Sequence, residues 1–252
     1  MDNMEKREGF EGITLTARYL WPSIRTVIAV TGIVCALILF IAALMKYSII
    51  FAIIGPMVVL AGSFIAYFAP MALNTGTQPV IDVMLPTTAR DKWAVKTGIF
   101  VIIIPVAIQT CAIAVSMNVT KLSPTLTGLN MGEMMPWYYY LCGFFSMMAP
   151  SATCLYAVTA YPGKKTKAIL MTLGVVLFMF IAGAILGITT SFRTGMECVE
   201  MSEVPSPELL QSTVERLTKE IMPLSLALNI LVGIFTIFLM RATYQATKNR
   251  QF

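Results

Sequence analysis

Six stretches of mostly apolar residues divide this chain, and nearly all of its charge lies in the gaps between them. A bilayer core about 30 Å thick needs roughly 20 apolar helical residues to cross it, because each residue adds about 1.5 Å. None of the six stretches has an acidic or basic residue near its middle. The pattern predicts membrane spans at 26–44, 48–68, 97–116, 137–159, 168–189 and 221–240.

The composition excludes an ordinary soluble domain. Hydrophobic residues make up 57% of the chain and charged residues 12%, whereas a soluble domain carries about 25% charged residues. The spans must be helices, because lipid offers no hydrogen-bond partners to open backbone and the runs lack the alternation of barrel strands. The predicted fold is therefore all-α, a polytopic bundle of six transmembrane helices.

The distribution of basic residues predicts the orientation. With a cytoplasmic N-terminus, the cytoplasmic segments hold 13 of the 18 lysine and arginine residues, and basic residues accumulate on the inner side. Both termini are then cytoplasmic. The chain divides into a cytoplasmic amphipathic helix at 1–25, a transmembrane domain at 26–241 with a cytoplasmic loop at 70–96 and an outer helical loop at 190–220, and a cytoplasmic tail at 242–252.

This topology also accounts for the sequence pI near 9.0. The positive charge is spread over short loops beside the membrane, so we expect the lipid bilayer as a partner and no nucleic acid. The resulting location is the cell inner membrane, crossed several times.

The segment before the first span has apolar residues at helical spacing: Phe10, Ile13, Ala17 and Leu20. This spacing predicts an amphipathic helix on the inner membrane face. Pro22 would end or bend that helix before the chain turns into the first span. The alternative is a frayed, solvated N-terminus.

Three spans contain proline inside an apolar run. Gly55 and Pro56 lie in the second span, Pro105 in the third and Pro150 in the fourth. Each proline is expected to kink its helix. The kinks either shape helix packing or mark a hinge or cavity lining.

Two amides and one stripe of small residues stand out within the spans. Gln109 and Asn229 are the strongest polar groups at depth, and each favours either an interhelical hydrogen bond or a substrate path. Gly183, Gly187 and Ser191 are four residues apart in the fifth span. Such a stripe allows close helix approach, either within the chain or at a dimer seam.

The outer loop after the fifth span is long enough to need structure of its own. Ser206, Pro207 and Glu208 are typical of a helix start, and an apolar stripe follows. We expect a short outer helix that is interrupted at Pro223, with a solvated loop as the alternative.

Catalytic motifs are missing from the sequence. The chain has no histidine, which excludes Ser-His and Cys-His arrangements. The five cysteines show no metal-binding spacing, although Cys198 could pair with Cys142. Residues 163–166 (GKKT) resemble part of a phosphate-binding loop, but Val158 stands where its first glycine belongs. We therefore expect no enzyme activity, no metal, no nucleotide site in this chain, and lysines that flank a cytoplasmic turn.

The segment at 83–93 predicts a short helix on the cytoplasmic surface. Pro86 holds Leu85 extended, and Thr88 with Asp91 three residues later fits a capping box. Trp93 could anchor this helix at the lipid headgroups. A rigid helix with apolar and charged ends suits docking of a soluble partner, and an inert turn beside the membrane is the alternative.

Leu85-Pro86-Thr87-Thr88 followed by Asp91-Lys92-Trp93 resembles the L-P-[small]-[ST]-x-x-[DE]-[KR]-[aromatic] segment of ABC-type export permeases, especially short Bacteroides-type members with six spans. The whole predicted layout is similar to theirs. In that family this loop contacts a separate ATP-hydrolysing subunit. Ala89 departs from relatives that have Arg there. The resemblance implies a partner-coupling surface made of Leu85, Pro86, Thr88, Asp91, Lys92 and Trp93.

The sequence thus leads to one expected function and one competitor. The first is the permease subunit of an ABC exporter, a homo- or heterodimer whose ATP is bound by the partner ATPase. The second is a membrane scaffold or assembly protein that transports nothing. A self-contained secondary transporter is disfavoured, because the spans lack buried charge and the two halves show no repeat.

Overall fold

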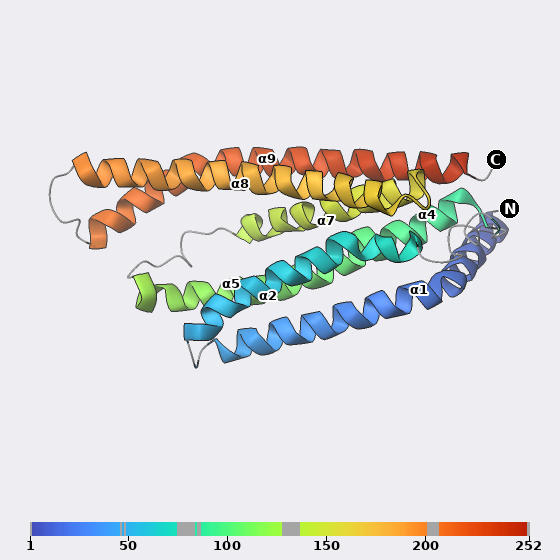
Figure 1. The fold of residues 1–252 in the computed structure, drawn as a ribbon, viewed down its shortest axis with the longest axis horizontal. Coiled ribbons are helices and arrows are strands. Elements are labelled where there is room, and N and C mark those ends of the chain that lie inside the picture. The colour runs from blue at the N-terminus through green and yellow to red at the C-terminus, as the bar shows by residue number, and fades with distance from the viewer. Residues whose placement is uncertain are drawn as a thin grey trace.

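The computed structural model describes residues 2–45, 47, 49–74, 84, 87–127, 137–200 and 207–250, and these ranges contain helices and turns but no strand. The long helices lie side by side as an elongated bundle (Figure 1), which confirms the all-α prediction. The elements are α1 (Asp2–Leu44), α2 (Ile49–Phe68), the 3-10 segment η1 (Ala69–Asn74), α4 (Ala89–Thr97), the π-helical segment η2 (Gly98–Ile103), α5 (Ile104–Thr127), α7 (Trp137–Ala160), α8 (Lys165–Glu200) and α9 (Pro207–Asn249).

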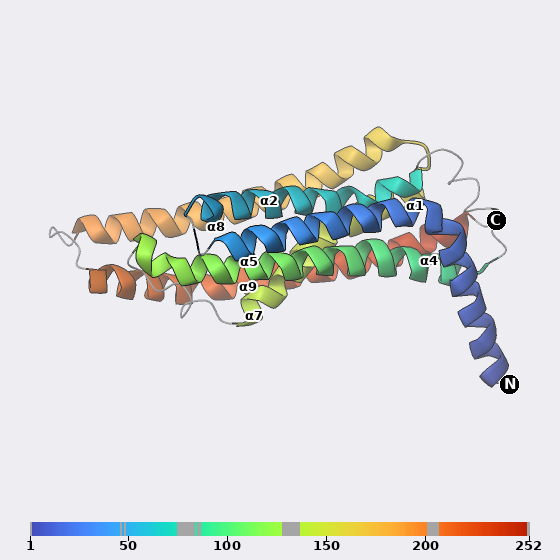
Figure 2. The same cartoon turned by 90° about the horizontal axis from the view of Figure 1, so that it is seen from below.

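Within the described part of the chain, five helical stretches are long and apolar enough to cross a membrane: Glu11–Leu44, Ile53–Asn74, Ala89–Asn118, Lys165–Ile185 and Met222–Asn249. The chain therefore fits an all-α membrane bundle. The predicted fourth span is also helical, as α7. The start of α1 and the end of α9 lie at the same end of the bundle (Figures 1 and 2), which we call the termini end.

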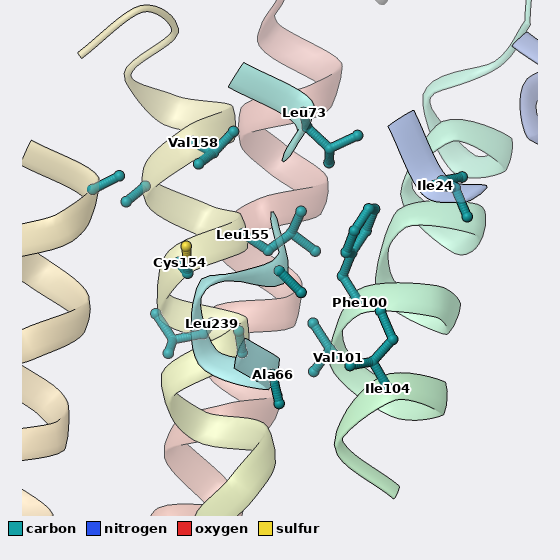
Figure 3. Close-up of a cluster of buried hydrophobic side chains, with 14 of the residues drawn as sticks. Ile24, Ala66, Leu73, Phe100, Val101, Ile104, Cys154, Leu155, Val158 and Leu239 are labelled. Atoms are coloured by element: carbon teal, nitrogen blue, oxygen red, sulfur yellow. The ribbon is translucent and has the colours of Figure 1, made fainter. Parts of the chain in front are cut away.

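Helix α7 lies at the centre of the bundle. It packs against α2, α5, α8 and α9. Ala149, Ala152 and Ala157 are fully buried on it, and such small side chains let neighbouring helices approach closely. The main core joins residues from most of the helices, including Ile24, Ala66, Phe100, Leu155 and Leu239 (Figure 3).

The outer surface of the bundle is apolar. Large side chains on α8 and α9 are mostly exposed, including Phe180 at 71% and Phe238 at 65%. In water an apolar surface of this extent would drive association, whereas lipid tails solvate it at no cost. The exposed surface therefore supports the membrane assignment independently of helix length.

Pro105 changes the geometry of the third predicted span. A proline has no N–H to donate to the carbonyl four residues earlier, and its ring crowds that carbonyl. The chain widens into η2 just before it, where the Ile104 N–H donates to Ile99 O, five residues back. The expected kink is thus a π-helical turn inside one continuous helix that runs from Ala89 to Thr127.

The prolines at the bundle ends behave differently from one another. Helix α1 continues through Pro22, and its N-terminal part turns away from the rest (Figure 2), which agrees with the predicted bend. The predicted interruption at Pro223 is wrong, because α9 continues through this residue. A proline removes one helical hydrogen bond, and packed neighbours can compensate for it.

Helices also extend into the predicted cytoplasmic tail and into the predicted outer loop. The tail predicted at 242–252 is helical as far as Asn249, and Thr243 and Thr247 are buried on it. At the opposite end α8 continues to Glu200 and α9 begins at Pro207, where a helix start was predicted. The outer loop is therefore built largely from extensions of its two neighbouring helices; Ser206 lies outside the described residues.

Candidate functional site at the start of α4

The start of α4 has the predicted cap. Thr88 has extended backbone angles, and its Oγ1 accepts a hydrogen bond from the Asp91 N–H. The Thr88 hydroxyl also donates to Asp91 Oδ2 over 2.8 Å. The negative charge of Asp91 in the first turn suits the positive end of the helix. This local pattern confirms the capping role of Thr88 that the sequence predicted.

Helix α1 closes over the same residues. A Cβ at Gly12 would overlap the Asp91 carboxylate, so any larger residue there would have to displace that buried side chain. The buried Thr16 hydroxyl lies 2.8 Å from the Gly12 carbonyl oxygen and 3.1 Å from the Thr87 hydroxyl. We call these contacts of Gly12 and Thr16 with Thr87 and Asp91 the α1 clasp. Sequence reasoning missed it, although Gly12 and Thr16 are four residues apart and thus share one helix face.

Trp93 joins α4 to α9. Its indole N–H donates to the Met240 carbonyl oxygen over 2.9 Å, and its ring packs edge-on against Tyr244 with centroids 5.9 Å apart. These contacts anchor Trp93 on α9, and its position at the lipid headgroups stays a prediction. An indole needs one polar partner and much apolar contact, and α9 supplies both.

The charged residues that follow the cap are internal. Asp91 is 7% exposed, Lys92 1% and Lys96 3%. The prediction of a surface helix charged at 90–92 therefore holds only for the exposed Arg90. Asp91 and Lys92 face the protein because α1 and α9 both pack on α4.

The proposed coupling residues thus separate into three groups. Thr88 is exposed, as are the neighbouring Arg90 and Met84. Asp91 and Lys92 are buried and Trp93 is half-buried, as described above. Leu85 and Pro86 lie outside the described residues. The part of α4 that is exposed at the surface is therefore its first turn, and the buried residues hold that turn in place.

The two intramembrane amides have different surroundings. Gln109 Nε2 occupies the space that a side chain at Gly143 of α7 would need, so Gln109 lies between α5 and α7. The Asn229 amide instead donates to Ser225 O of its own helix over 2.8 Å. Among the described contacts this bond lies within one helix, and an interhelical partner of Asn229 stays a prediction. An amide can also satisfy its donor within one helix turn.

The small-residue stripe faces away from the rest of the chain at Gly183. This residue is exposed, and a Cβ built on it would meet no atom within 4 Å. An intrachain helix contact at Gly183 is therefore excluded, and the dimer seam remains a proposal. The side chains at 187 and 191 lie outside the described part.

In the part of the chain with described side chains, no group of three His, Cys, Asp or Glu residues could hold a metal ion. Cys35, Cys111 and Cys154 are free thiols. The suggested pair of Cys142 and Cys198 lies outside the described side chains.

No protein-family model, curated protein sequence or solved structure matches the chain.

Proposed function

We propose that this protein is the transmembrane permease subunit of an ABC exporter. The chain forms the translocation path, and a separate ATPase subunit binds at the start of α4. The observation that carries the proposal is the position of the motif that resembles export permeases. The described residues of this motif, 87–93, lie at the termini end (Figure 1), where the capped helix α4 continues directly into a predicted span.

The contacts of α4 supply a route for mechanical coupling. Movement of its first turn passes to α5 along the continuous helix, to α1 through the α1 clasp, and to α9 through Trp93. Three helices of membrane-spanning length would then respond to one push. Rigid-body motion of packed helices is a common mode of two-state transitions.

The finer topology belongs to the same proposal. We place six spans in the bilayer, with α7 as the sixth membrane-spanning helix, and both termini in the cytoplasm. The protein works in the cell inner membrane as a homo- or heterodimer of permeases, with the open face at Gly183 of α8 as the seam. ATP is bound by the partner ATPase and not by this chain.

Co-purification tests the proposal. The tagged chain is isolated in mild detergent, and ATP hydrolysis by the captured complex is measured. Arg90→Glu reverses an exposed charge on the first turn of α4 and should abolish capture of the ATPase. Arg25→Glu makes the same change at an exposed position on α1 and should leave capture intact.

Two outcomes contradict the exporter. One is that no ATP-hydrolysing subunit accompanies the wild-type chain. The other is that Arg90→Glu and Arg25→Glu capture it equally. A partner that binds through α4 but hydrolyses no ATP would favour the membrane scaffold.

A further inference from the structure

We propose that the turn between α7 and α8 binds the phosphate headgroup of an anionic membrane lipid. This turn lies at the termini end of the bundle (Figure 1), and the proposed transport function does not depend on it. Five features of the turn support the site, and they concern its shape, charge, unpaired donor, fixed cations and lipid-facing flank.

The turn itself is tight and well defined. The Lys164 N–H donates to Tyr161 O over 3.1 Å, and Gly163 has φ of +78°. Proline at the second position and glycine with positive φ at the third are typical of a type II turn. This sharp reversal brings the end of α7 directly to the start of α8.

The start of α8 is strongly and uniformly positive. Lys164, Lys165 and Lys167 are exposed, and the first turn of α8 has no acidic residue. The free N–H groups of a helix start already favour an anion. Among described side chains at the termini end, the acidic residues are Glu11 and Asp91, on α1 and α4. The lysines are therefore not neutralised by an acidic residue of α7 or α8.

A buried amide provides an independent sign of a missing acceptor. Asn74, at the end of η1, is 4% exposed. Its Oδ1 accepts the Gly163 N–H over 2.8 Å, while its Nδ2 is buried without a hydrogen-bond partner. Because the amide is planar and its oxygen meets the turn, the unpaired donor lies beside the same turn. An unpaired buried donor is costly, and a phosphate oxygen bound at this turn would supply the missing acceptor.

Two cations have defined contacts beside the turn. Lys167 Nζ lies over the Tyr161 ring, 3.4 Å from its centroid. Arg250 Nη1 donates to Thr159 O over 3.4 Å, which places a further positive charge at the end of α7. These contacts order the cations before a ligand arrives and so lower the entropy that binding must lose.

The surface next to the lysines identifies the kind of anion. One turn further along α8, Ile169, Leu170 and Leu173 are 37%, 65% and 41% exposed. A phosphate group beside exposed apolar side chains matches a lipid, with its headgroup on the lysines and its acyl chains along α8. A free phosphate ion would use only the polar half of this surface.

Lipid binding to the purified full-length chain tests the inference. The midpoint of thermal unfolding is followed in neutral detergent as dioleoylphosphatidylglycerol, dioleoylphosphatidylcholine or inorganic phosphate is added, and an apparent Kd is obtained from each series. We expect the anionic lipid to bind the wild-type chain at least about tenfold more tightly than either of the others.

Charge-matched variants locate the site. Replacing Lys164, Lys165 and Lys167 together with Gln should weaken binding of the anionic lipid by about tenfold or more. Replacing Arg18, Arg25 and Lys248 together with Gln removes the same charge from exposed positions on α1 and α9, and should change binding by less than about threefold.

Several results would overturn the inference. They are equal loss of binding in the two triple variants, no loss in the lysine variant, or inorganic phosphate binding as tightly as the anionic lipid. If the lysine variant does not fold, the salt dependence of the wild-type chain decides instead. Raising salt from about 0.05 to about 0.5 M should weaken binding severalfold, and insensitivity to salt would contradict a phosphate site.

Discussion

The close contact between Gly12 and Asp91 makes a sharp prediction about the α1 clasp. Gly12→Ala places a methyl group where the Asp91 carboxylate lies. Gly32→Ala makes the same change on the same helix, at a position where a new Cβ meets nothing within 4 Å. The two variants therefore share their helix-propensity effect and differ in the steric clash.

The magnitude follows from these two terms. Alanine in a helix interior is favoured over glycine by about 0.5–1 kcal/mol, and this gain applies to both variants. Overpacking typically costs about 1–3 kcal/mol, and this cost applies only to Gly12→Ala. The free energies of unfolding of the two variants should thus differ by about 1–3 kcal/mol, with Gly32→Ala the more stable. At about 2–4 °C per kcal/mol for a chain of this size, the midpoints differ by about 2–12 °C.

Thermal unfolding of the purified protein in one detergent measures the difference, and a second background isolates its cause. In a chain that already carries Asp91→Ala, the carboxylate is gone, so adding Gly12→Ala should no longer destabilise. If Gly12→Ala matches Gly32→Ala in the native background, or remains destabilising beside Asp91→Ala, the α1 clasp is wrong.

Three further changes test individual contacts. Trp93→Phe keeps an aromatic ring at this position but removes the indole N–H that donates to Met240 O. It should lower the free energy of unfolding by at least about 0.5–1.5 kcal/mol, as chemical denaturation would measure, and an unchanged value would refute the bond. Gly143→Ala should push against the Gln109 amide and lower the free energy of unfolding by about 1–3 kcal/mol. Adding Gln109→Ala should restore the midpoint of thermal unfolding, and failure of that rescue would contradict the contact. Ser151→Ala removes the buried hydrogen bond to Ala66 O and leaves that backbone acceptor one partner short, so it should cost about 1 kcal/mol; a neutral effect on the denaturation midpoint would count against the packing of α7 on α2.

The sequence was sufficient to predict the helices, because the physics of a membrane span is local. A run of about 20 apolar residues has few alternatives to a helix in lipid. The Thr88 cap was also predictable, since its partner Asp91 is three residues away. The same reasoning predicted a bend in α1, whose N-terminal part turns away from the rest (Figure 2).

The environment of α4 could not be predicted in the same way. The Thr16–Thr87 contact joins residues 71 positions apart, and the Trp93–Met240 bond joins residues 147 apart. Lysine is usually a solvated surface residue, and only the packing of distant helices buries Lys92. Local patterns therefore identified the helix that carries the candidate site but not which of its faces is available to a partner.

The central claim is that the chain crosses a membrane with the start of α4 and the α7–α8 turn on the cytoplasmic side. Single cysteines at Arg90, Lys165 and Lys219, each exposed in the structure, can be introduced into a variant without native cysteines. They are then treated with a membrane-impermeant thiol reagent on intact cells and on permeabilised cells. The account predicts that position 219 reacts in intact cells, while positions 90 and 165 react only after permeabilisation. Labelling of 90 or 165 from outside, or of 219 only after permeabilisation, would contradict the account.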